Sequence, residues 1–442
     1  MSISLVTVLG AAYACVSASV NPSPKIKEVI DPQLEHLSKK YNCSISVAIL
    51  GPEAAERVNV TSVGGVTDRE SKRPTEVSDL FVWGSVTKLV TGVAVLRLVE
   101  QNKLKLSDSA PQHIDPFIKK FAEKDPKLNF TSMEDLWGPE VYNITVKDLL
   151  GMRSGIPDYD TASPSGKGAG DLLRADCYAH PKDSFSPPQI LNFPWLRTGK
   201  LLFPPGECYR EKYGNCYSST NFVLLGCLLA HHAGVSDWNE YKQADALAPA
   251  AADLPGLHFA VSGPPSQYTM VKGYDTTHYN NNTRAIDVSD VAGVFSGWTA
   301  SDLVMDAPGV AALGQDLYGP SHKLLSKRLV DEMYTDENGK FYGLATFNLT
   351  WVSQDEIAYG HLGATYGFQS LIIYVPSVQL SVAIATNIER DRQDQPRDVF
   401  CSVFHAAKAI MLGKPVPHCK FINAGYYESY CICKDADGTV IV

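Results

Sequence analysis

The pattern of hydrophobic and polar positions predicts a helix and two strands near the N-terminus. Residues 23–41, SPKIKEVIDPQLEHLSKKY, carry apolar side chains at helical spacing. Residues 43–50, CSISVAIL, alternate as a half-buried strand does, and residues 55–65, AERVNVTSVGG, have the pattern of its hairpin partner. We therefore expect a helix followed by a β-hairpin.

Strand-forming sequence returns near the C-terminus. It occupies residues 340–352, 368–376 and 380–387, and residues 397–412 then have a helical pattern. The compact way to combine these segments is an α+β fold in which both chain ends build one antiparallel sheet flanked by helices. A mostly helical subdomain, about residues 103–340, would be inserted, and the natural cleft would lie between the two parts.

Within this middle part, residues 158–189 are rich in Pro, Gly and Ser, which is typical of an insertion or lid. The whole chain has 442 residues, 45% of them hydrophobic, as in an ordinary folded protein. Its net charge of -9 leaves no surplus of Lys and Arg to neutralise phosphates, which argues against nucleic-acid binding.

The first twenty residues carry no charged side chain and have a short apolar centre. Small residues follow, so we expect a signal peptide over residues 1–18, cleaved near Ala18. The alternative is an uncleaved membrane anchor, since the run is barely long enough to span a bilayer. We therefore expect a secreted or secretory-lumen protein with a main domain over residues 22–412 and an extension over residues 413–442.

Sequons and cysteines also favour export. Of ten cysteines, nine remain once Cys15 leaves with the signal peptide, and an oxidising compartment would allow several bridges and leave one thiol. No cysteine pattern has zinc-finger spacing. N-linked glycans could be attached at six sequons, which are Asn42, Asn59, Asn129, Asn143, Asn281 and Asn348.

Candidate chemistry begins with Ser85 and Lys88. Ser85 stands at the start of a predicted helix, and Lys88 lies on the same helix face one turn later. The following residues 89–99 are apolar nearly all round, so the helix should be buried. A buried lysine that loses its proton is a general base, and the adjacent serine is its proton donor and a nucleophile.

A structural alternative exists for the same two residues. Ser85 could cap the helix N-terminus while the Lys88 side chain extends along the helix to water. The tetrapeptide Ser-x-x-Lys alone favours this alternative, and the rest of the chain reverses the preference.

The sequence resembles the serine β-lactamase and penicillin-binding-protein superfamily, and within it the branch of class C β-lactamases, D-alanyl-D-alanine carboxypeptidases and esterases. The resemblance covers roughly residues 25–412 and rests on motifs in the expected order. These are FVWGSVTKLVTGVAVLRLVEQNKLKLSD (81–108), ITVKDLLGMRSGIPDY (144–159), LLFPPGE (201–207), YSSTNFVLLGCLLAHHAG (217–234), VFSGWTASDL (294–303) and the strand pair beginning GHLGATYGFQ (360–369).

The resemblance implies roles for individual residues. Ser85 would be the acylated nucleophile, Lys88 its base, and Tyr217 the tyrosine that shuttles a proton to the leaving group. The N–H groups of Ser85 and Ala364 would form the oxyanion hole. Substrate-binding positions would be His361, Gly363 and Ser219, and neither a metal nor an organic cofactor is implied.

Departures from the family pattern concern three places. Ser219 stands where the Tyr-Ser-Asn motif has its amide, and Met152 stands where a histidine is usual, so Met152 is not expected to be catalytic. A rival Tyr-x-Asn exists at Tyr213, and spacing from the Pro-Gly loop slightly favours it. The ungapped fit of YSSTNFVLLG favours Tyr217, which we choose.

Two cysteines bracket the extra residues between the Pro-Gly loop and Tyr217. We expect Cys208 and Cys216 to form a disulfide that closes this insertion into a small loop. In that case Tyr213 lies on the loop and Tyr217 at the helix.

The function expected from these residues is a secreted serine hydrolase that acts through an acyl-enzyme on an ester, peptide or cyclic amide. Its partner would be a small-molecule or peptide substrate. An acyltransferase is a close variant, and a catalytically inactive binding protein of the same fold is the alternative from another class. Because His361 replaces a permanently charged lysine, we expect neutral esters to be preferred over penicillins and cephalosporins at neutral pH. Preference for carboxylate substrates should grow as pH falls through the titration of His361.

Overall fold

The computed structural model describes most of the chain. The described residues are 21–52, 58–160, 172–208, 216–248, 254, 256–279, 284–334, 341–354, 356–425, 428–435 and 437–440. The expected signal peptide with Cys15 and Ala18, the sequon at Asn281 and the rival Tyr213 lie outside them. In the described part of the chain, no helix combines the length and apolar character needed to cross a membrane.

Helices occur along the whole chain and strands concentrate at its two ends. The helices are α1 (Ser23–Tyr41), α2 (Thr87–Glu100), α3 (Ala110–Lys124), α4 (Met133–Trp137), α5 (Val146–Leu150), α6 (Leu172–Ala179), α7 (Pro187–Leu191), α9 (Thr220–His232), α10 (Ala307–Tyr318), α11 (Lys327–Tyr334), α12 (Thr350–Ser353) and α13 (Asp394–Met411). The strands are β1 (Ile45–Leu50), β2 (Asn59–Gly64), β3 (Phe81–Val82), β4 (His258–Phe259), β5 (Tyr274–Asp275), β6 (Ile286–Asp287), β7 (Leu303–Met305), β8 (Phe347–Asn348), β9 (Tyr359–Thr365), β10 (Phe368–Val375), β11 (Leu380–Thr386), β12 (Ile388–Glu389), β13 (His418–Ile422) and β14 (Tyr430–Lys434).

The central sheet combines both ends of the chain. Its order is β2-β1-β11-β10-β9-β8, and every neighbouring pair is antiparallel. The N-terminal hairpin joins the C-terminal strands through the pair β1–β11, in which Ile45 lies opposite Thr386 and Leu50 opposite Ser381. The expected α+β fold with one antiparallel sheet from both chain ends is confirmed.

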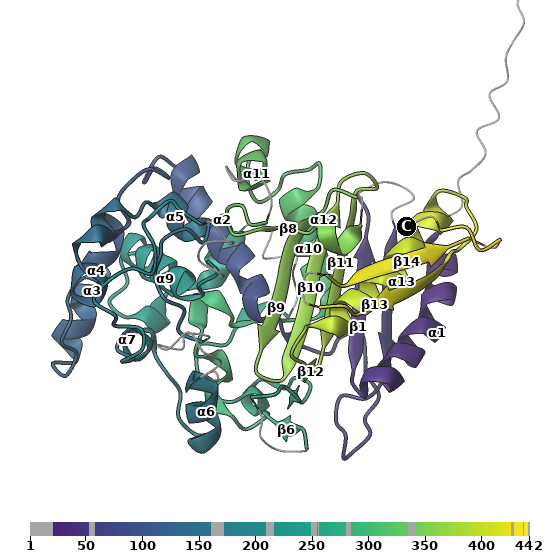
Figure 1. The fold of residues 1–442 in the computed structure, drawn as a ribbon, viewed down its shortest axis with the longest axis horizontal. Coiled ribbons are helices and arrows are strands. Elements are labelled where there is room, and N and C mark those ends of the chain that lie inside the picture. Colours follow the sequence, from purple (N-terminus) through teal and green to yellow (C-terminus); the bar gives the residue numbers. More distant parts are fainter. Residues whose placement is uncertain are drawn as a thin grey trace, which may run out of the picture.

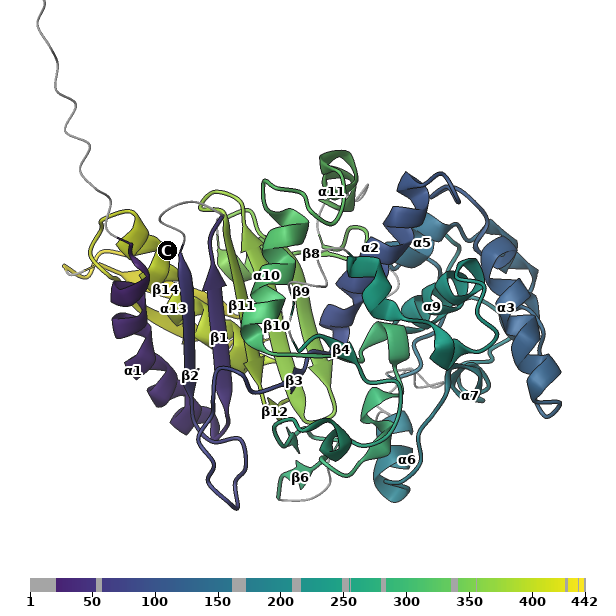
Figure 2. The same ribbon diagram turned by 180° about the vertical axis from the view of Figure 1, so that it is seen from behind.

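Helices cover both faces of this sheet. Strand β1 is buried along its whole length, as a strand covered on both faces must be. Helices α1 and α13 pack together on one face, beside the C-terminal hairpin β13–β14 (Figure 1). Helix α10 packs on the other face, against β1, β10 and β11 (Figure 2). Although α10 falls within residues 103–340, it therefore belongs to the layer on the sheet.

Several of the other helices gather beyond the β9–β8 edge of the sheet. Helices α2, α3, α5, α7 and α9 lie on this side in both views (Figures 1 and 2), and α4 lies there in Figure 1. Helix α9 is buried along most of its length and packs against α2, α3 and α5. This mostly helical part faces the sheet across the segment that carries Ser85.

One strand prediction was largely wrong. Of residues 340–352, only Phe347 and Asn348 form a strand, β8, and a short helix follows. Ala345 has a left-handed φ of 57°, and the N–H of Gly343 donates to Thr346 in a tight turn. This turn presses Ala345 against Gly92 of α2, where an added Cβ would lie 2.3 Å from the Ala345 Cβ. Packing against α2 thus overrides the local strand preference.

Three disulfides tie the described part of the chain. Cys208–Cys216 is confirmed, Cys401–Cys431 attaches the β13–β14 hairpin to α13, and Cys419–Cys433 joins the two strands of the hairpin. The expectation of a single leftover thiol was wrong, because the buried Cys43 and Cys227 both stay outside the three disulfides. Burial raises the pKa of the Cys43 thiol to about 12, so this cysteine behaves as a small apolar side chain.

Candidate active site

Ser85 and Lys88 meet at the start of α2. Ser85 lies in a 3₁₀ turn, Gly84–Val86, that leads directly into the helix. The Lys88 Nζ lies 2.8 Å from the Ser85 Oγ and donates to the carbonyl of Ala300 at 2.9 Å. The Lys88 side chain is fully buried, and Ser85 makes no cap bond to α2, so the alternative of a helix cap with a solvent-exposed lysine is wrong.

Burial changes the acidity of Lys88. Loss of hydration lowers its pKa from 10.5 to about 8, against the opposing effect of the carboxylates of Asp160 and Asp158. A sizeable fraction of Lys88 is therefore uncharged near pH 8 and able to accept a proton. The neighbouring Ser85 hydroxyl is the proton donor within reach.

The residues around Lys88 explain why it stays buried. Lys88 and the eight residues after it in α2 are all buried. The Thr91 hydroxyl donates to the carbonyl of Thr299 at 2.7 Å, and the Thr87 hydroxyl accepts from the N–H of Leu303 at 2.9 Å. The segment from Thr299 to Leu303 is thereby fixed along α2, and it supplies the carbonyl that Lys88 uses.

Gly84 brings the Ser85 turn against strand β9. Its φ is 52°, and an added Cβ would lie 2.6–2.9 Å from backbone atoms of Ala364. The Ser370 hydroxyl supports the same contact by donating to the carbonyl of Trp83 at 2.9 Å. Because glycine alone fits here, the backbones of Ser85 and Ala364 can lie close together, as a pair of oxyanion-binding N–H groups requires.

Tyr217 lies beside Lys88, just before α9. The Lys88 Nζ is 5.2 Å from the centre of the Tyr217 ring, and the ring stacks on Phe347 with centroids 5.9 Å apart. The preceding residue, Cys216, is fixed by its disulfide to Cys208. The described residues thus bring Ser85 and Lys88, from one segment, together with Tyr217, from another.

The residues after Tyr217 are held by the segment at 152–158. The Ser219 N–H donates to Asp158 Oδ1 at 2.9 Å, and the Ser218 N–H donates to the Met152 sulfur at 3.5 Å. Met152 is buried and takes part in packing. Ser219 lines the cleft.

His361 and Gly363 lie behind the cleft instead of on its wall. His361 is fully buried, with Nε2 3.0 Å from the Tyr342 hydroxyl and Nδ1 2.5 Å from the carbonyl of Leu362. An added Cβ at Gly363 would lie 2.1 Å from the carbonyl oxygen of Trp83. Neither residue lines the cleft, so the structure does not place either of them in position to contact a substrate directly. Gly363 permits the approach of β9 to the Ser85 turn.

The environment of His361 also removes the expected pH dependence of substrate choice. Burial and the nearby Lys88 hold the pKa of His361 well below its ordinary value. The imidazole is therefore uncharged at neutral pH. Its ring centroid lies 6.3 Å from that of Tyr217, so it can position Tyr217 through packing.

A cleft opens at Ser85, with a volume of about 230 Å³. Ala364 and Ser219 line it together with residues that the sequence did not single out for function. These are Tyr159, Asp160, Leu173, Arg174, Tyr279 and Tyr366. Only Asp160 and Tyr159 carried a usable signal, because they lie within the motif-like segment 144–159 or directly after it.

A buried ionic group forms one end of this cleft. Arg174 binds both oxygens of Glu389 at 2.7 and 2.8 Å and one oxygen of Asp275 at 2.7 Å. One guanidinium thus serves two buried carboxylates, and all three side chains are nearly inaccessible to solvent. The group links α6 to β5 and β12 and stabilises that wall.

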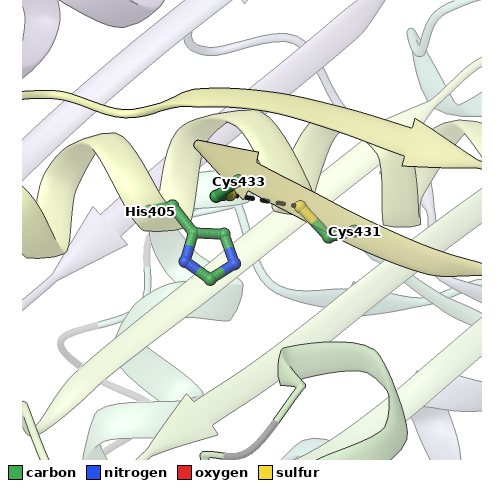
Figure 3. A group of neighbouring side chains, drawn as sticks. All are labelled: His405, Cys431 and Cys433. Atoms are coloured by element: carbon green, nitrogen blue, oxygen red, sulfur yellow. Dashed lines mark hydrogen bonds between the residues drawn. The ribbon is translucent and has the colours of Figure 1, made fainter. Parts of the chain in front are cut away.

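Another cluster of metal-ligand residue types lies apart from the cleft. His405, Cys431 and Cys433 have their ligand atoms within 4.8 Å of one another (Figure 3). Both cysteines are oxidised in disulfides, to Cys401 and Cys419, and so offer no thiolate for a metal ion. The cluster is a structural part of the C-terminal hairpin.

Comparison with known proteins places this geometry in a family. The Beta-lactamase family model matches residues 54–400. Protein flp from Staphylococcus aureus (strain NCTC 8325 / PS 47) is 24% identical over 204 residues, which are 46% of this chain and 33% of that protein. The chain thus matches about a third of the length of this curated relative.

Solved structures agree in fold. The D-amino acid amidase from Ochrobactrum anthropi SV3, complexed with L-phenylalanine amide, has a TM-score of 0.64 and 16% identity over 88% of this chain and 99% of that one. The octameric penicillin-binding protein homologue from Pyrococcus abyssi has a TM-score of 0.61 and 20% identity over 92% and 85%. With the family model covering most of its length, the chain belongs to the Beta-lactamase family and has the fold of serine β-lactamases and penicillin-binding proteins.

Proposed function

We propose that this protein is a secreted serine hydrolase that forms an acyl-enzyme at Ser85 with Lys88 as the base. The bond cleaved would be an ester, a peptide or a cyclic amide. One observation carries the proposal, namely the 2.8 Å contact between the Ser85 Oγ in the cleft and the fully buried Lys88 Nζ, whose pKa is lowered to about 8. Membership of a family with hydrolase neighbours supports it.

Acylation would follow from this contact. Neutral Lys88 accepts the Ser85 proton while the Oγ forms a bond to the substrate carbonyl carbon, whose oxygen becomes an oxyanion. The N–H groups of Ser85 and Ala364 would bind that oxyanion, a role supported by the close approach at Gly84. The intermediate collapses when the leaving group takes a proton and departs, and Ser85 is left as an ester.

Deacylation would need a second proton transfer. Tyr217, beside Lys88, would pass the proton to the leaving group and later accept one from the attacking water. The water adds to the acyl carbon, and the bond between that carbon and the Ser85 Oγ then breaks. The Ser85 Oγ takes back a proton, which restores the free enzyme. If an alcohol or amine replaces the water, the same steps give an acyltransferase.

Export is part of the proposal. Three disulfides and the surface positions of the sequons support an oxidising compartment and glycosylation. Asn42, Asn59, Asn129 and Asn143 are exposed, and Asn348 is partly exposed, so each could carry a glycan. Enzymatic deglycosylation of protein from a eukaryotic secretion host tests this by a mass shift.

Turnover of a neutral aryl ester tests the reaction. The wild-type protein should release p-nitrophenol from p-nitrophenyl acetate, and Ser85→Ala should abolish this release. Lys88→Ala should lower kcat/KM by about two orders of magnitude or more. Ser289→Ala is the matched control, since it removes the hydroxyl of a partly exposed serine that does not line the cleft, and it should retain full activity. Equal turnover by Ser85→Ala and the wild type would refute the proposal, and no turnover by either protein would favour an inactive binding protein.

A further inference from the structure

The contact between the C-terminal hairpin and α13 gathers sulfur and imidazole side chains outside the cleft. Cys401 and His405 are four residues apart in α13, and Cys431 and Cys433 are two residues apart in β14. Residues at i and i+4 share one face of a helix, and residues at i and i+2 share one face of a strand. The fold thus assembles a group of metal-ligand side chains from two short pairs, without zinc-finger spacing in the sequence.

The distances within this group suit a single metal ion. The ligand atoms of His405, Cys431 and Cys433 all lie within 4.8 Å of one another, and the two sulfurs are 3.6 Å apart (Figure 3). Zinc binds thiolate sulfur at about 2.3 Å in tetrahedral sites, so two sulfurs on one zinc ion lie about 3.8 Å apart. The folded hairpin therefore already holds these two sulfurs at the spacing of zinc ligands.

His405 adds a second, independent observation. Its side chain is buried, with 5% of the residue exposed, and its ring packs against Phe404. Among the described residues, the His405 ring has neither a hydrogen bond nor an ion pair. A buried polar group without a partner costs free energy, and a metal ion bound to a ring nitrogen would remove that cost.

The hairpin has only a small interior of its own. Its buried cluster consists of Cys401, Cys431 and Cys433, with Cys419 and Phe421 packed against it, and is separate from the main core. So small a cluster needs a cross-link to hold a segment in place, and either disulfides or a metal ion can supply it. Two disulfides do so in the oxidised protein.

We propose that, when these cysteines are thiols, Cys401, His405, Cys431 and Cys433 bind one zinc ion that holds the hairpin on α13. The newly made chain has this thiol form before oxidation, and a dithiol reductant restores it. Each disulfide then takes two electrons and two protons from one dithiol, which itself becomes a disulfide. On binding, Zn²⁺ displaces the protons of the three thiols to water, and the neutral imidazole donates a nitrogen lone pair. The inference goes beyond the proposed hydrolase and does not depend on it.

Cobalt(II) is the spectroscopic probe for this site in the full chain, reduced with a phosphine under anaerobic conditions. One equivalent of Co²⁺ should give the visible absorption of tetrahedral thiolate coordination, and Zn²⁺ should remove it. The oxidised protein should give no such absorption. A reduced protein that binds no Co²⁺ in this way would overturn the inference.

The imidazole ligand is tested by a matched pair of histidine variants. His405→Gln should weaken Zn²⁺ binding at least about tenfold and shift the Co²⁺ absorption, because the imidazole is lost. His418→Gln, the same change at an exposed hairpin residue, should leave both unchanged. Identical spectra and affinities for the two variants would contradict a role for His405.

Double cysteine variants test whether the metal binds at the hairpin. Cys431→Ser/Cys433→Ser should abolish the thiolate absorption. Cys208→Ser/Cys216→Ser removes the thiols of the other disulfide and should retain it. Loss in both variants, or in neither, would overturn the assignment of the site.

Single variants decide the fourth ligand. Cys401→Ser should lower the affinity for Zn²⁺ at least about tenfold, because Cys401 shares the face of α13 with His405. Cys419→Ser should stay within about threefold. The reverse order would overturn the proposed ligand set.

Limited proteolysis measures whether the ion holds the hairpin. In the reduced wild type, cleavage after Met411 should be at least about tenfold slower with Zn²⁺ than without it. In reduced His405→Gln, the same Zn²⁺ concentration should give little protection. Oxidised His405→Gln should resist cleavage as the oxidised wild type does, which shows that the variant folds. Equal cleavage of the reduced wild type with and without Zn²⁺ would contradict the structural role of the ion.

Discussion

At the scale of the residue, Lys88 governs both chemistry and stability. It is a fully buried amine with two polar partners, Ser85 and Ala300, inside a helix of otherwise apolar character. Burial lowers its pKa to about 8 and prepares it as a base. The same burial costs free energy of folding, because the charged amine is less favourable in the folded protein than in the unfolded chain.

The activity of the protein should therefore rise with pH. For a neutral ester, kcat/KM should increase through an apparent pKa near 8, because only uncharged Lys88 accepts the Ser85 proton. His361 should add no inflection between about pH 6 and 8, since its pKa is far below this range. A pH series of initial rates for the wild type and His361→Gln measures both. A midpoint near pH 6.5 that disappears in His361→Gln would contradict this account.

Replacing Lys88 by methionine should stabilise the protein while abolishing activity. A pKa of about 8 in place of 10.5 corresponds to a cost of about 3 kcal/mol at neutral pH. Loss of the partner of the Ala300 carbonyl offsets part of this, which leaves a gain of about 1–2 kcal/mol in the free energy of unfolding.

The gain should depend on pH in a definite direction. The unfolded chain binds more protons than the folded one between about pH 8 and 10, so wild-type stability rises with pH in that window. The advantage of Lys88→Met should accordingly shrink from pH 7 to pH 10 in urea unfolding experiments. A Lys88→Met protein that is less stable than the wild type at pH 7 would show that burial does not lower the pKa of Lys88.

Residue chemistry could be predicted from the sequence where it is local. Ser85 and Lys88 are one helical turn apart, so their contact follows from the spacing. The burial of His361 could not be foreseen, because its partners Tyr342 and Phe347 come from the turn that packs on α2.

At the scale of the element, strongly periodic segments were predicted well. Helix α1, strands β1, β10 and β11 and helix α13 occupy the predicted segments within a few residues. The exception is residues 340–352, where contact with α2 forces a left-handed Ala345 and leaves a two-residue strand. Local pattern fails there because the constraint comes from a helix more than 200 positions earlier.

The element that carries Tyr217 gives a direct test. Tyr217 lies between the disulfide-bonded Cys216 and the start of α9, and the Lys88 Nζ lies 5.2 Å from the centre of its ring. We expect Tyr217→Phe to lower kcat/KM for the neutral ester about a hundredfold, because the proton shuttle is lost. Tyr213→Phe, the matched change on the disulfide loop, should stay within about threefold. The reverse order would assign the catalytic role to Tyr213.

At the scale of the whole molecule, the sheet unites both chain ends and leaves the C-terminal hairpin at its outer face. The hairpin β13–β14 is fixed to α13 by Cys401–Cys431 and to itself by Cys419–Cys433. None of the residues that line the cleft comes from the hairpin. The hairpin should therefore affect stability and not acylation.

Removal of these two disulfides checks that separation. With alanine at Cys401, Cys419, Cys431 and Cys433, limited proteolysis should cut the chain after Met411, because each bridge supplies on the order of 3 kcal/mol. The acylation rate at Ser85 should stay within about twofold. The matched variant Cys208→Ala/Cys216→Ala should leave the hairpin protected and slow acylation, since Cys216 adjoins Tyr217. Equal slowing in both variants would contradict the assignment of the hairpin to structure alone.

The central claim is that Ser85, activated by Lys88, becomes covalently acylated. Intact-mass spectrometry after incubation with a fluorophosphonate probe tests it most directly. The account predicts a single adduct that maps to the peptide containing Ser85, is absent from Ser85→Ala and forms at least about a hundredfold more slowly in Lys88→Ala. An adduct that persists in Ser85→Ala, or an unmodified wild-type protein under conditions that label a known serine hydrolase, would contradict it.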